Sequence, residues 1–186
     1  MLELGTKAPG FSLPDTVTGK MISLQEYKGK KGVLILFISN HCPYVKLIKT
    51  ELARYASDYM EKGIGVIAIG SNDVENYPDD APDKMKADAE EFGYSFPYLY
   101  DETQQVAKAY KAACTPDLYL FDGEMKLYYR GQFDDSRPKN DITPTGSDLR
   151  EATDLLLERK AAPKFQKPSI GCNIKWKKGM EPEYFG

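Results

Sequence analysis

The feature that most constrains the fold of this chain is an uninterrupted apolar run that ends in a short polar segment and a cysteine. The run covers residues 33–38 (Val-Leu-Ile-Leu-Phe-Ile), and residues 39–42 (Ser-Asn-His-Cys) follow it. Apolar residues without polar alternation are typical of a strand that is buried on both faces of a parallel or mixed sheet. Pro43 comes next, and proline is favoured at the first helical position because the first helical N–H has no intrahelical partner. The sequence therefore predicts that Cys42 lies where a buried strand passes into a helix.

This junction is a favourable place for a reactive cysteine. The unpaired N–H groups and the positive end of the helix dipole favour an anion at a helix N-terminus, and the thiolate is the reactive form of cysteine. Lys46, about one helical turn further on, adds a positive charge. The alternative is that Cys42 is simply a small residue packed under the strand, as free cysteines usually are. The polar residues before it favour the reactive interpretation.

Size and composition exclude several classes of function. The chain has 186 residues, of which 41% are hydrophobic and 28% charged, as expected for one globular domain. A net charge of -3 gives no reason to expect nucleic acid or an anionic membrane as a partner, and no apolar run approaches a membrane span in length. The first residues lack the pattern of a secretory signal. Three scattered cysteines favour redox chemistry in a reducing, cytoplasmic compartment over a disulfide scaffold. With one histidine in the chain we expect no metal site, and the chemistry needs no dissociable cofactor.

The other apolar segments predict an α/β sheet. A second buried strand at 64–69 completes a βαβ unit with parallel strands, so residues 70–73 should lie at the same sheet edge as Cys42. A helix is expected from Pro82 to Gly93, followed by an extended piece at 96–100. Asp101 should then cap a short helix, with Gln104 in the capping-box position.

The remaining turn signals predict two hairpins and a final helix. Thr18-Gly19-Lys20 indicates a hairpin tip near the N-terminus, and Asp122-Gly123 indicates a second hairpin between apolar runs at 118–121 and 126–130. Ser147 or Asp148 should cap the final helix. We expect one domain over residues 1–162 and a tail over 163–186 that packs on the same domain.

Three motifs together resemble the peroxiredoxin-like branch of the alkyl hydroperoxide reductase/thiol-specific antioxidant superfamily. They are residues 40–46 (Asn-His-Cys-Pro-Tyr-Val-Lys), 114–117 (Cys-Thr-Pro-Asp) and 168–176 (Pro-Ser-Ile-Gly-Cys-Asn-Ile-Lys-Trp). Residues 5–13 also resemble the opening of peroxiredoxins and of related thiol-disulfide reductases. The resemblance implies a thioredoxin-like fold, in which helices flank a central mixed β-sheet, with an N-terminal β extension and the C-terminal tail.

The resemblance also implies roles for single residues. Cys42 corresponds to the attacking cysteine, and Ser39 corresponds to the hydroxyl residue that contacts the cysteine and the peroxide. Thr115 and Pro116 match a cis-proline loop, which leaves the preceding backbone open to a substrate in extended form. Asn40, His41 and Pro43 complete the expected substrate-binding set.

The chain departs from the pattern of its apparent relatives at two informative positions. Val45 stands where thioredoxin has its second cysteine, so Cys42 needs a remote partner for any disulfide. Pro116 stands about where peroxiredoxins place their active-site arginine, which leaves Arg130 and Arg137 to supply that charge.

Two cysteines compete as the partner of Cys42. If the tail folds back, Cys172 can attack an oxidised Cys42 and form a disulfide. Cys114, beside the Thr115-Pro116 motif, is the competing partner, and either residue can instead be merely packed. His41 neighbours Cys42 in sequence, but adjacent side chains point apart. A surface or subunit-contact histidine is therefore favoured over a thiolate–imidazolium pair.

The favoured function is a thiol-dependent oxidoreductase that reduces peroxides through Cys42. An external thiol, such as a thioredoxin or a low-molecular-weight thiol, would restore the protein. One alternative is reduction or exchange of disulfides beside Thr115 and Pro116, and another is a redox sensor or binding module without turnover. No nucleic acid or membrane partner is expected, and a homodimer is compatible with the sequence.

Overall fold

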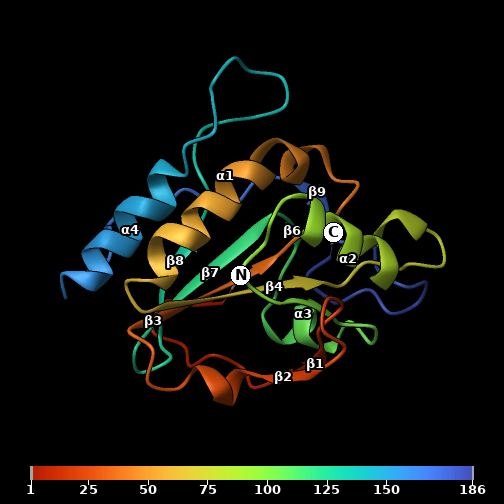
Figure 1. Cartoon of the computed structure of the whole chain (residues 1–186), viewed down its shortest axis with the longest axis horizontal. Coiled ribbons are helices and arrows are strands. Elements are labelled where there is room, and N and C mark those ends of the chain that lie inside the picture. The colour runs from red at the N-terminus through yellow and green to blue at the C-terminus, as the bar shows by residue number, and fades with distance from the viewer. Residues whose placement is uncertain (1, 186) are drawn as a thin grey trace.

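The computed structural model describes residues 2–185 and has a five-stranded mixed sheet at its centre (Figure 1). The strand order is β5-β4-β3-β7-β8. These strands are β3 (Gly32–Phe37), β4 (Ile64–Gly70), β5 (Tyr98–Tyr100), β7 (Asp117–Asp122) and β8 (Leu127–Gly131). The central strand β3 pairs in parallel with β4 and antiparallel with β7. This arrangement confirms the predicted thioredoxin-like α/β fold.

Four α-helices and two small strand pairs surround the sheet. The helices are α1 (Pro43–Met60), α2 (Pro82–Glu91), α3 (Gln105–Ala109) and α4 (Ser147–Leu157), and Leu24–Tyr27 (η1) and Pro78–Asp80 (η2) are short 3-10 turns. The strands β1 (Ser12–Pro14) and β2 (Met21–Ser23) form the predicted N-terminal hairpin. A second pair, β6 (Cys114–Thr115) and β9 (Cys172–Asn173), joins the C-terminal tail to the body of the domain.

The side chains of β3 point alternately to the two faces of the sheet, and the core is divided between these faces. Leu34 and Leu36 pack on one face with α1, α2 and α4. Ile35 and Phe37 pack on the other face with α3, the N-terminal segment and the tail. Figure 1 shows α1 and α4 together on one side of the sheet and α3 with the β1–β2 hairpin on the other. Two layers of apolar contact explain why β3 and β4 have no exposed residue.

The C-terminal tail packs on the same domain, at the second face. Ile174 and Trp176 are buried among the residues of that face. Ile170 is half exposed instead and does not contribute to this packing. The Asp73 backbone N–H also donates to the Lys175 carbonyl, which fixes the tail beside the end of β4.

The predicted cap of the short helix by Asp101 was right, because its carboxylate accepts hydrogen bonds from the backbone N–H groups of Val106 and Ala107. Two other cap predictions were wrong. Gln104 is not part of a capping box; it is the residue before α3, and its amide donates to the carbonyls of Ser71 and Lys175. Gly146, in a left-handed conformation, precedes α4 where Ser147 or Asp148 was expected, and no side chain caps this helix. In both places a tertiary contact or a backbone turn replaced the local hydrogen bond that the sequence pattern favours.

Candidate active site

Cys42 lies at the predicted junction between β3 and α1. It is the residue before the first turn of α1, Pro43 begins the helix, and no side chain caps the helix N-terminus. The thiol is fully buried, and its Sγ donates a hydrogen bond to the Thr115 carbonyl oxygen over 3.0 Å. The peptide bond that follows Thr115, to Pro116, is cis. The helix N-terminus and the Thr115-Pro116 loop therefore meet at Cys42, as the resemblance implied.

The tail brings Cys172 to the same place. In the antiparallel pair of β6 and β9, Cys172 is the partner of Thr115 and Asn173 is the partner of Cys114. The Cys172 side chain is partly buried and packs against the core that includes Cys42. Burial raises the pKa of the Cys172 thiol to about 11, and hydrogen bonding to Cys42 and its charge add to the increase. Cys172 is thus protonated at neutral pH and lies against the same core cluster as Cys42.

Cys114 lies beside the Thr115-Pro116 loop as a partly buried thiol. Its Sγ hydrogen-bonds the Pro116 carbonyl at 3.6 Å. Burial raises the pKa of the Cys114 thiol far above its ordinary value, and the charge of Asp117 adds to this. Across β6 and β9 the partner of Cys114 is Asn173, whereas Thr115, which Cys42 bonds, is the partner of Cys172. All three cysteines are free.

The polar segment between β3 and Cys42 is organised by a buried carboxylate that the sequence analysis did not single out. Asp80 is 3% exposed. It accepts hydrogen bonds from the Asn40 backbone N–H at 2.6 Å and from the Ser39 hydroxyl at 3.0–3.1 Å. It also accepts from the Asn72 side chain at 2.7 Å, which confirms that residues 70–73 share the sheet edge of Cys42. The acidic, proline-containing sequence around Asp80 was the available signal, but nothing in it indicates which carboxylate turns inward.

Ser39 and Asn40 are consequently structural parts of this network. The Ser39 hydroxyl is directed to Asp80 and His41, and no hydrogen bond joins it to Cys42 in residues 2–185. The Ser39 hydroxyl thus has other hydrogen-bond partners than the resemblance implied, and its predicted contact with the cysteine and a peroxide stays a prediction. The Asn40 side chain donates to the Asp79 carbonyl and accepts from the Tyr98 hydroxyl. Hydrogen bonds within the protein therefore use both the amide nitrogen and the amide oxygen of Asn40.

His41 also bonds Asp80 rather than Cys42. Its Nδ1 lies 2.7 Å from Asp80 Oδ2, and its ring stacks on Tyr77 with a centroid distance of 5.4 Å. The Lys175 ammonium lies 5.5 Å from the centroid of Tyr77. Because a carboxylate only accepts hydrogen bonds, Nδ1 carries a proton and the opposite nitrogen, Nε2, is the free end of the ring. The expectation of a partly exposed histidine without a thiolate pair agrees with this placement.

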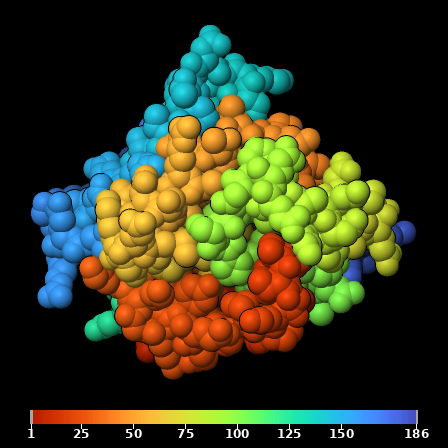
Figure 2. Space-filling model, viewed as in Figure 1, coloured from red at the N-terminus to blue at the C-terminus, as the bar shows by residue number. Residues whose placement is uncertain are grey.

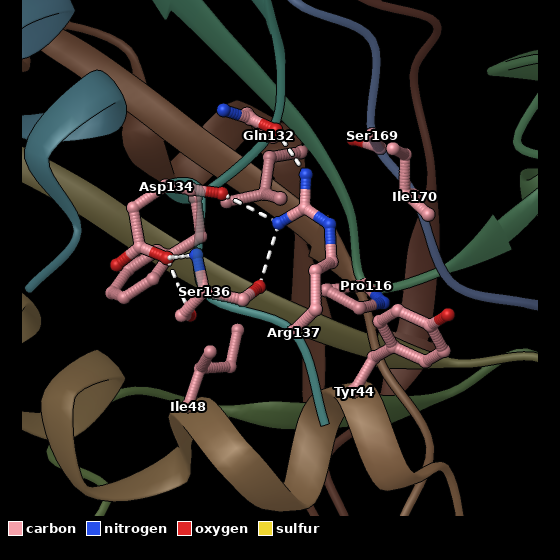
Figure 3. Close-up of a pocket in the computed structure, with 11 residues that line it drawn as sticks. Tyr44, Ile48, Pro116, Gln132, Asp134, Ser136, Arg137, Ser169 and Ile170 are labelled. Carbon is pink, nitrogen blue, oxygen red and sulfur yellow. Dashed lines mark hydrogen bonds between the residues drawn. The ribbon is translucent and has the colours of Figure 1, made fainter. Parts of the chain in front are cut away.

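Arg137 lies beside the Thr115-Pro116 loop, whereas Arg130 does not. Arg137 lines a pocket with Tyr44, Pro116 and Ile170 (Figure 3). Arg130 belongs to β8 and lies outside this pocket. No group of three or more potential metal-ligating side chains occurs between residues 2 and 185, and none of the helices described there is long and apolar enough to cross a membrane.

A buried cysteine at the N-terminus of the helix that follows the central strand of a mixed sheet is the arrangement of a thioredoxin-like, thiol-dependent oxidoreductase. Comparison with known proteins agrees with this class. Residues 4–130 match the model of the AhpC/TSA family. The chain therefore belongs to the AhpC/TSA family.

Some known relatives are named thiol-disulfide oxidoreductases and others putative peroxiredoxins. The thiol-disulfide oxidoreductase ResA of Halalkalibacterium halodurans is 28% identical over 129 residues, which cover 68% of this chain and 68% of that protein. A putative peroxiredoxin of Mycobacterium tuberculosis is 26% identical over 115 residues, covering 62% of this chain and 68% of the relative. The crystal structure of an uncharacterized conserved protein from Geobacillus kaustophilus is 56% identical, with a TM-score of 0.94 and coverage of 96% and 95% of the two chains.

Proposed function

We propose that this protein is a thiol peroxidase in which Cys42 reduces the peroxide and Cys172 resolves the oxidised cysteine. The observation that carries the proposal is the register of β6 and β9. It sets Cys172 opposite Thr115, whose carbonyl oxygen accepts the hydrogen bond from Cys42. The tail thus supplies a second thiol from the same chain. The helix itself cannot supply one, because Val45 stands where a local second cysteine would be.

The first step is attack of the Cys42 thiolate on one peroxide oxygen. The S–O bond forms while the O–O bond breaks, and the departing alkoxide or hydroxide takes a proton and leaves as alcohol or water. The product at the protein is the sulfenic acid of Cys42. The positive end of α1 and its unpaired N–H groups favour the thiolate and the oxygen that approaches it.

The second step forms the disulfide. The Cys172 sulfur attacks the Cys42 sulfur, the S–O bond breaks, and hydroxide leaves as water with the proton of the Cys172 thiol. An external thiol then reduces the disulfide with two equivalents, which become its own disulfide. The charge of Cys42 contributes to the raised pKa of Cys172, and that charge is absent from the sulfenic acid. Oxidation of Cys42 thus makes Cys172 easier to deprotonate when it is needed.

The alternative, exchange with the disulfide of a protein substrate, meets an obstacle in the tail. An extended substrate would pair with the backbone of Thr115, but β9 already occupies that edge of β6. A protein disulfide would have to displace residues 172–173 first. A peroxide needs no extended backbone edge for binding.

The test is intact mass and a free-thiol count after one equivalent of hydrogen peroxide, followed by peptide mapping. We expect the loss of two hydrogen atoms and a Cys42–Cys172 link. The Cys172→Ser variant should instead accumulate sulfenic or sulfinic acid on Cys42, and Cys114→Ser, the matched control, should behave as the wild type. A Cys42–Cys114 link would contradict the assigned partner, and an unmodified Cys42 would contradict the peroxidase itself and favour disulfide exchange or a binding role.

A further inference from the structure

The pocket around Arg137 contains a positive charge that the proposed chemistry does not use. The guanidinium Nη1 donates to the carbonyl oxygens of Asp134 at 2.7 Å and Ser136 at 2.6 Å, and Nη2 donates to the Gln132 side-chain oxygen. Figure 3 shows the guanidinium held by these groups at one wall of the pocket. All of these acceptors are uncharged. Arg137 forms no salt bridge in the part of the chain that the structure describes.

Two carboxylates lie near this charge without forming an ion pair with it. Asp135, whose pKa is lowered mainly by its hydrogen bond from Lys167 and in part by the charge of Arg137, pairs with Lys167 at 2.8 Å. The Asp134 carboxylate accepts hydrogen bonds from Ser136 and from the backbone N–H groups of Thr145 and Gly146. In Figure 3 this carboxylate lies on the side away from the Arg137 guanidinium. A guanidinium has five N–H donors, of which the protein uses three. Nε–H and the second Nη2–H remain for a ligand, and two adjacent donors on a planar cation suit a carboxylate.

The pocket is next to each part of the cysteine pair. Tyr44 follows Cys42 by two residues, Pro116 follows the Thr115 that Cys42 bonds, and Ile170 precedes Cys172 by two residues. The cavity itself is small, about 20 Å³, which is room for little more than one water-sized group. Only a group as small as a carboxylate can therefore enter it, with the rest of the ligand outside the cavity. The residues that line the pocket in Figure 3 come from α1, from the Thr115-Pro116 loop, from the segment after β8 and from the tail.

We propose that Arg137 is the anion subsite for the reductant, and that this reductant is a low-molecular-weight thiol bearing a carboxylate. The inference rests on the proposed function, because it concerns reduction of the Cys42–Cys172 disulfide. Cys42 is fully buried while Cys172 is partly exposed, so the external thiolate attacks the Cys172 sulfur. A mixed disulfide forms at Cys172, and the Cys42 thiolate leaves at the N-terminus of α1. A second thiol breaks the mixed disulfide and releases the reductant as its own disulfide.

The experiment measures single-turnover reduction of the oxidised protein by two thiols of similar size. The Cys42–Cys172 disulfide is made with a diamide oxidant, without peroxide, and free thiols are counted by mass after timed quenching. The probes are 3-mercaptopropionate, which carries a carboxylate, and 2-mercaptoethanol, which is neutral. Each rate constant is calculated from the concentration of the thiolate. The quantity compared between variants is the rate constant for 3-mercaptopropionate divided by that for 2-mercaptoethanol. This ratio is unaffected when a substitution changes the exposure of the disulfide to both thiols equally.

We expect this ratio to fall about tenfold in Arg137→Gln, the order of one charge-assisted contact. The ratio should stay at the wild-type value in the matched control Arg54→Gln, which removes the same charge from an exposed residue of α1. An unchanged ratio in Arg137→Gln would overturn the proposal. Since Arg137 also orders its own loop, two further measurements do not depend on that variant's folding: Arg137→Lys should retain part of the preference, and added salt should lower the wild-type ratio. A wild-type ratio insensitive to salt would also overturn it.

The two proposals fail in different ways. If both thiols reduce the disulfide without any dependence on Arg137, the anion subsite is wrong while the two-cysteine cycle stands. If diamide produces no Cys42–Cys172 disulfide, the two-cysteine cycle is wrong and the reductant subsite falls with it.

Discussion

Gly171 approaches Thr115 so closely that a Cβ atom on Gly171 would stand 2.0 Å from the Thr115 carbonyl oxygen. The same oxygen accepts the hydrogen bond from Cys42. Residue 171 therefore has to be glycine for the tail to lie where it does, and the next residue, Cys172, then faces Thr115. The approach of Cys172 to Thr115 therefore depends on the absence of a side chain at residue 171.

The Gly171→Ala variant tests this dependence without changing either cysteine. The added methyl group must push β9 away from β6, because the atom that it meets belongs to the backbone. We expect the rate of Cys42–Cys172 disulfide formation after peroxide to fall about a hundredfold, the order found for a misplacement of ~1 Å. Gly10→Ala is the matched control, because a Cβ there meets no atom within 4 Å. Wild-type kinetics in Gly171→Ala would show that the tail approaches Cys42 in another way.

The pH dependence of alkylation should report the contact between Cys172 and Cys42. Iodoacetamide reacts with the thiolate, and the pKa of Cys172 is raised from 9.0 to about 11. In a reduced Cys114→Ser background, we expect the alkylation rate of Cys172 to rise with pH toward a midpoint near that value. Adding Cys42→Ser removes the hydrogen bond and the charge that contribute to the shift, so the midpoint should fall. An unchanged midpoint would mean that Cys172 is shifted by burial alone.

The same shift has a consequence for stability. The folded protein holds the Cys172 proton more tightly than the unfolded chain does. Its contribution to the free energy of unfolding is complete below pH 9.0 and declines as the pH rises through about 11. Urea unfolding of the wild type and of Cys172→Ser, under reducing conditions, measures this contribution at pH 8 and pH 10.5. We expect the wild type to lose more stability between the two pH values than Cys172→Ser does.

Asp80→Asn should loosen the segment that leads to Cys42. The carboxylate accepts hydrogen bonds from Ser39, Asn40 and Asn72, and an amide replaces one accepting oxygen with a donor. We expect a loss of about 2–3 kcal/mol in the free energy of unfolding, the range for hydrogen bonds to a buried charged group. Asp79→Asn, at the exposed neighbouring position, is the control and should change stability by less than about 0.5 kcal/mol. Equal effects of the two substitutions, measured by urea unfolding, would contradict the central role of Asp80.

Lys49 and Asp88 form the most buried ion pair between helices, with side chains 4% and 12% exposed. Burial raises the pKa of Asp88, and hydrogen bonding to Lys49 opposes the increase. Lys49→Met leaves the carboxylate without its cation, so we expect a loss of about 3–5 kcal/mol at neutral pH. The loss should shrink in acid, where the Asp88 carboxyl is protonated and no buried charge remains.

Two controls separate the charge of Lys49 from its packing. Lys46→Met makes the same change at an exposed position of α1 and should have little effect on stability. The double variant Lys49→Met/Asp88→Leu should recover most of the lost stability, because it removes both buried charges. A double variant as unstable as Lys49→Met would show that the methionine packs badly and that the ion pair is not the cause.

Much of the fold could be predicted because the strongest sequence signals here are local. The run at 33–38, the proline at 43 and the Asp122-Gly123 turn each correspond to an observed element within a residue or two. The site was less predictable. Gln104 fits a capping pattern, yet its amide bonds carbonyls of the β4 end and the tail. Ser39 fits a catalytic pattern, yet its hydroxyl bonds Asp80. A buried polar group takes whichever partner the tertiary structure offers, because leaving it unpaired costs more than any local preference.

The sequence by itself determined the fold class, the position of Cys42 at a strand-to-helix junction and the absence of a second cysteine in the same helix turn. These follow from periodicity, proline placement and residue identity, which act over a few neighbouring residues. Only the tertiary structure decided which distant cysteine pairs with Thr115, the residue that Cys42 bonds. It also decided which carboxylate supports the preceding loop and which arginine lies beside Pro116. Those outcomes depend on the path of the tail and of the segment after β8, and contacts between residues so far apart in the chain leave no local pattern to read.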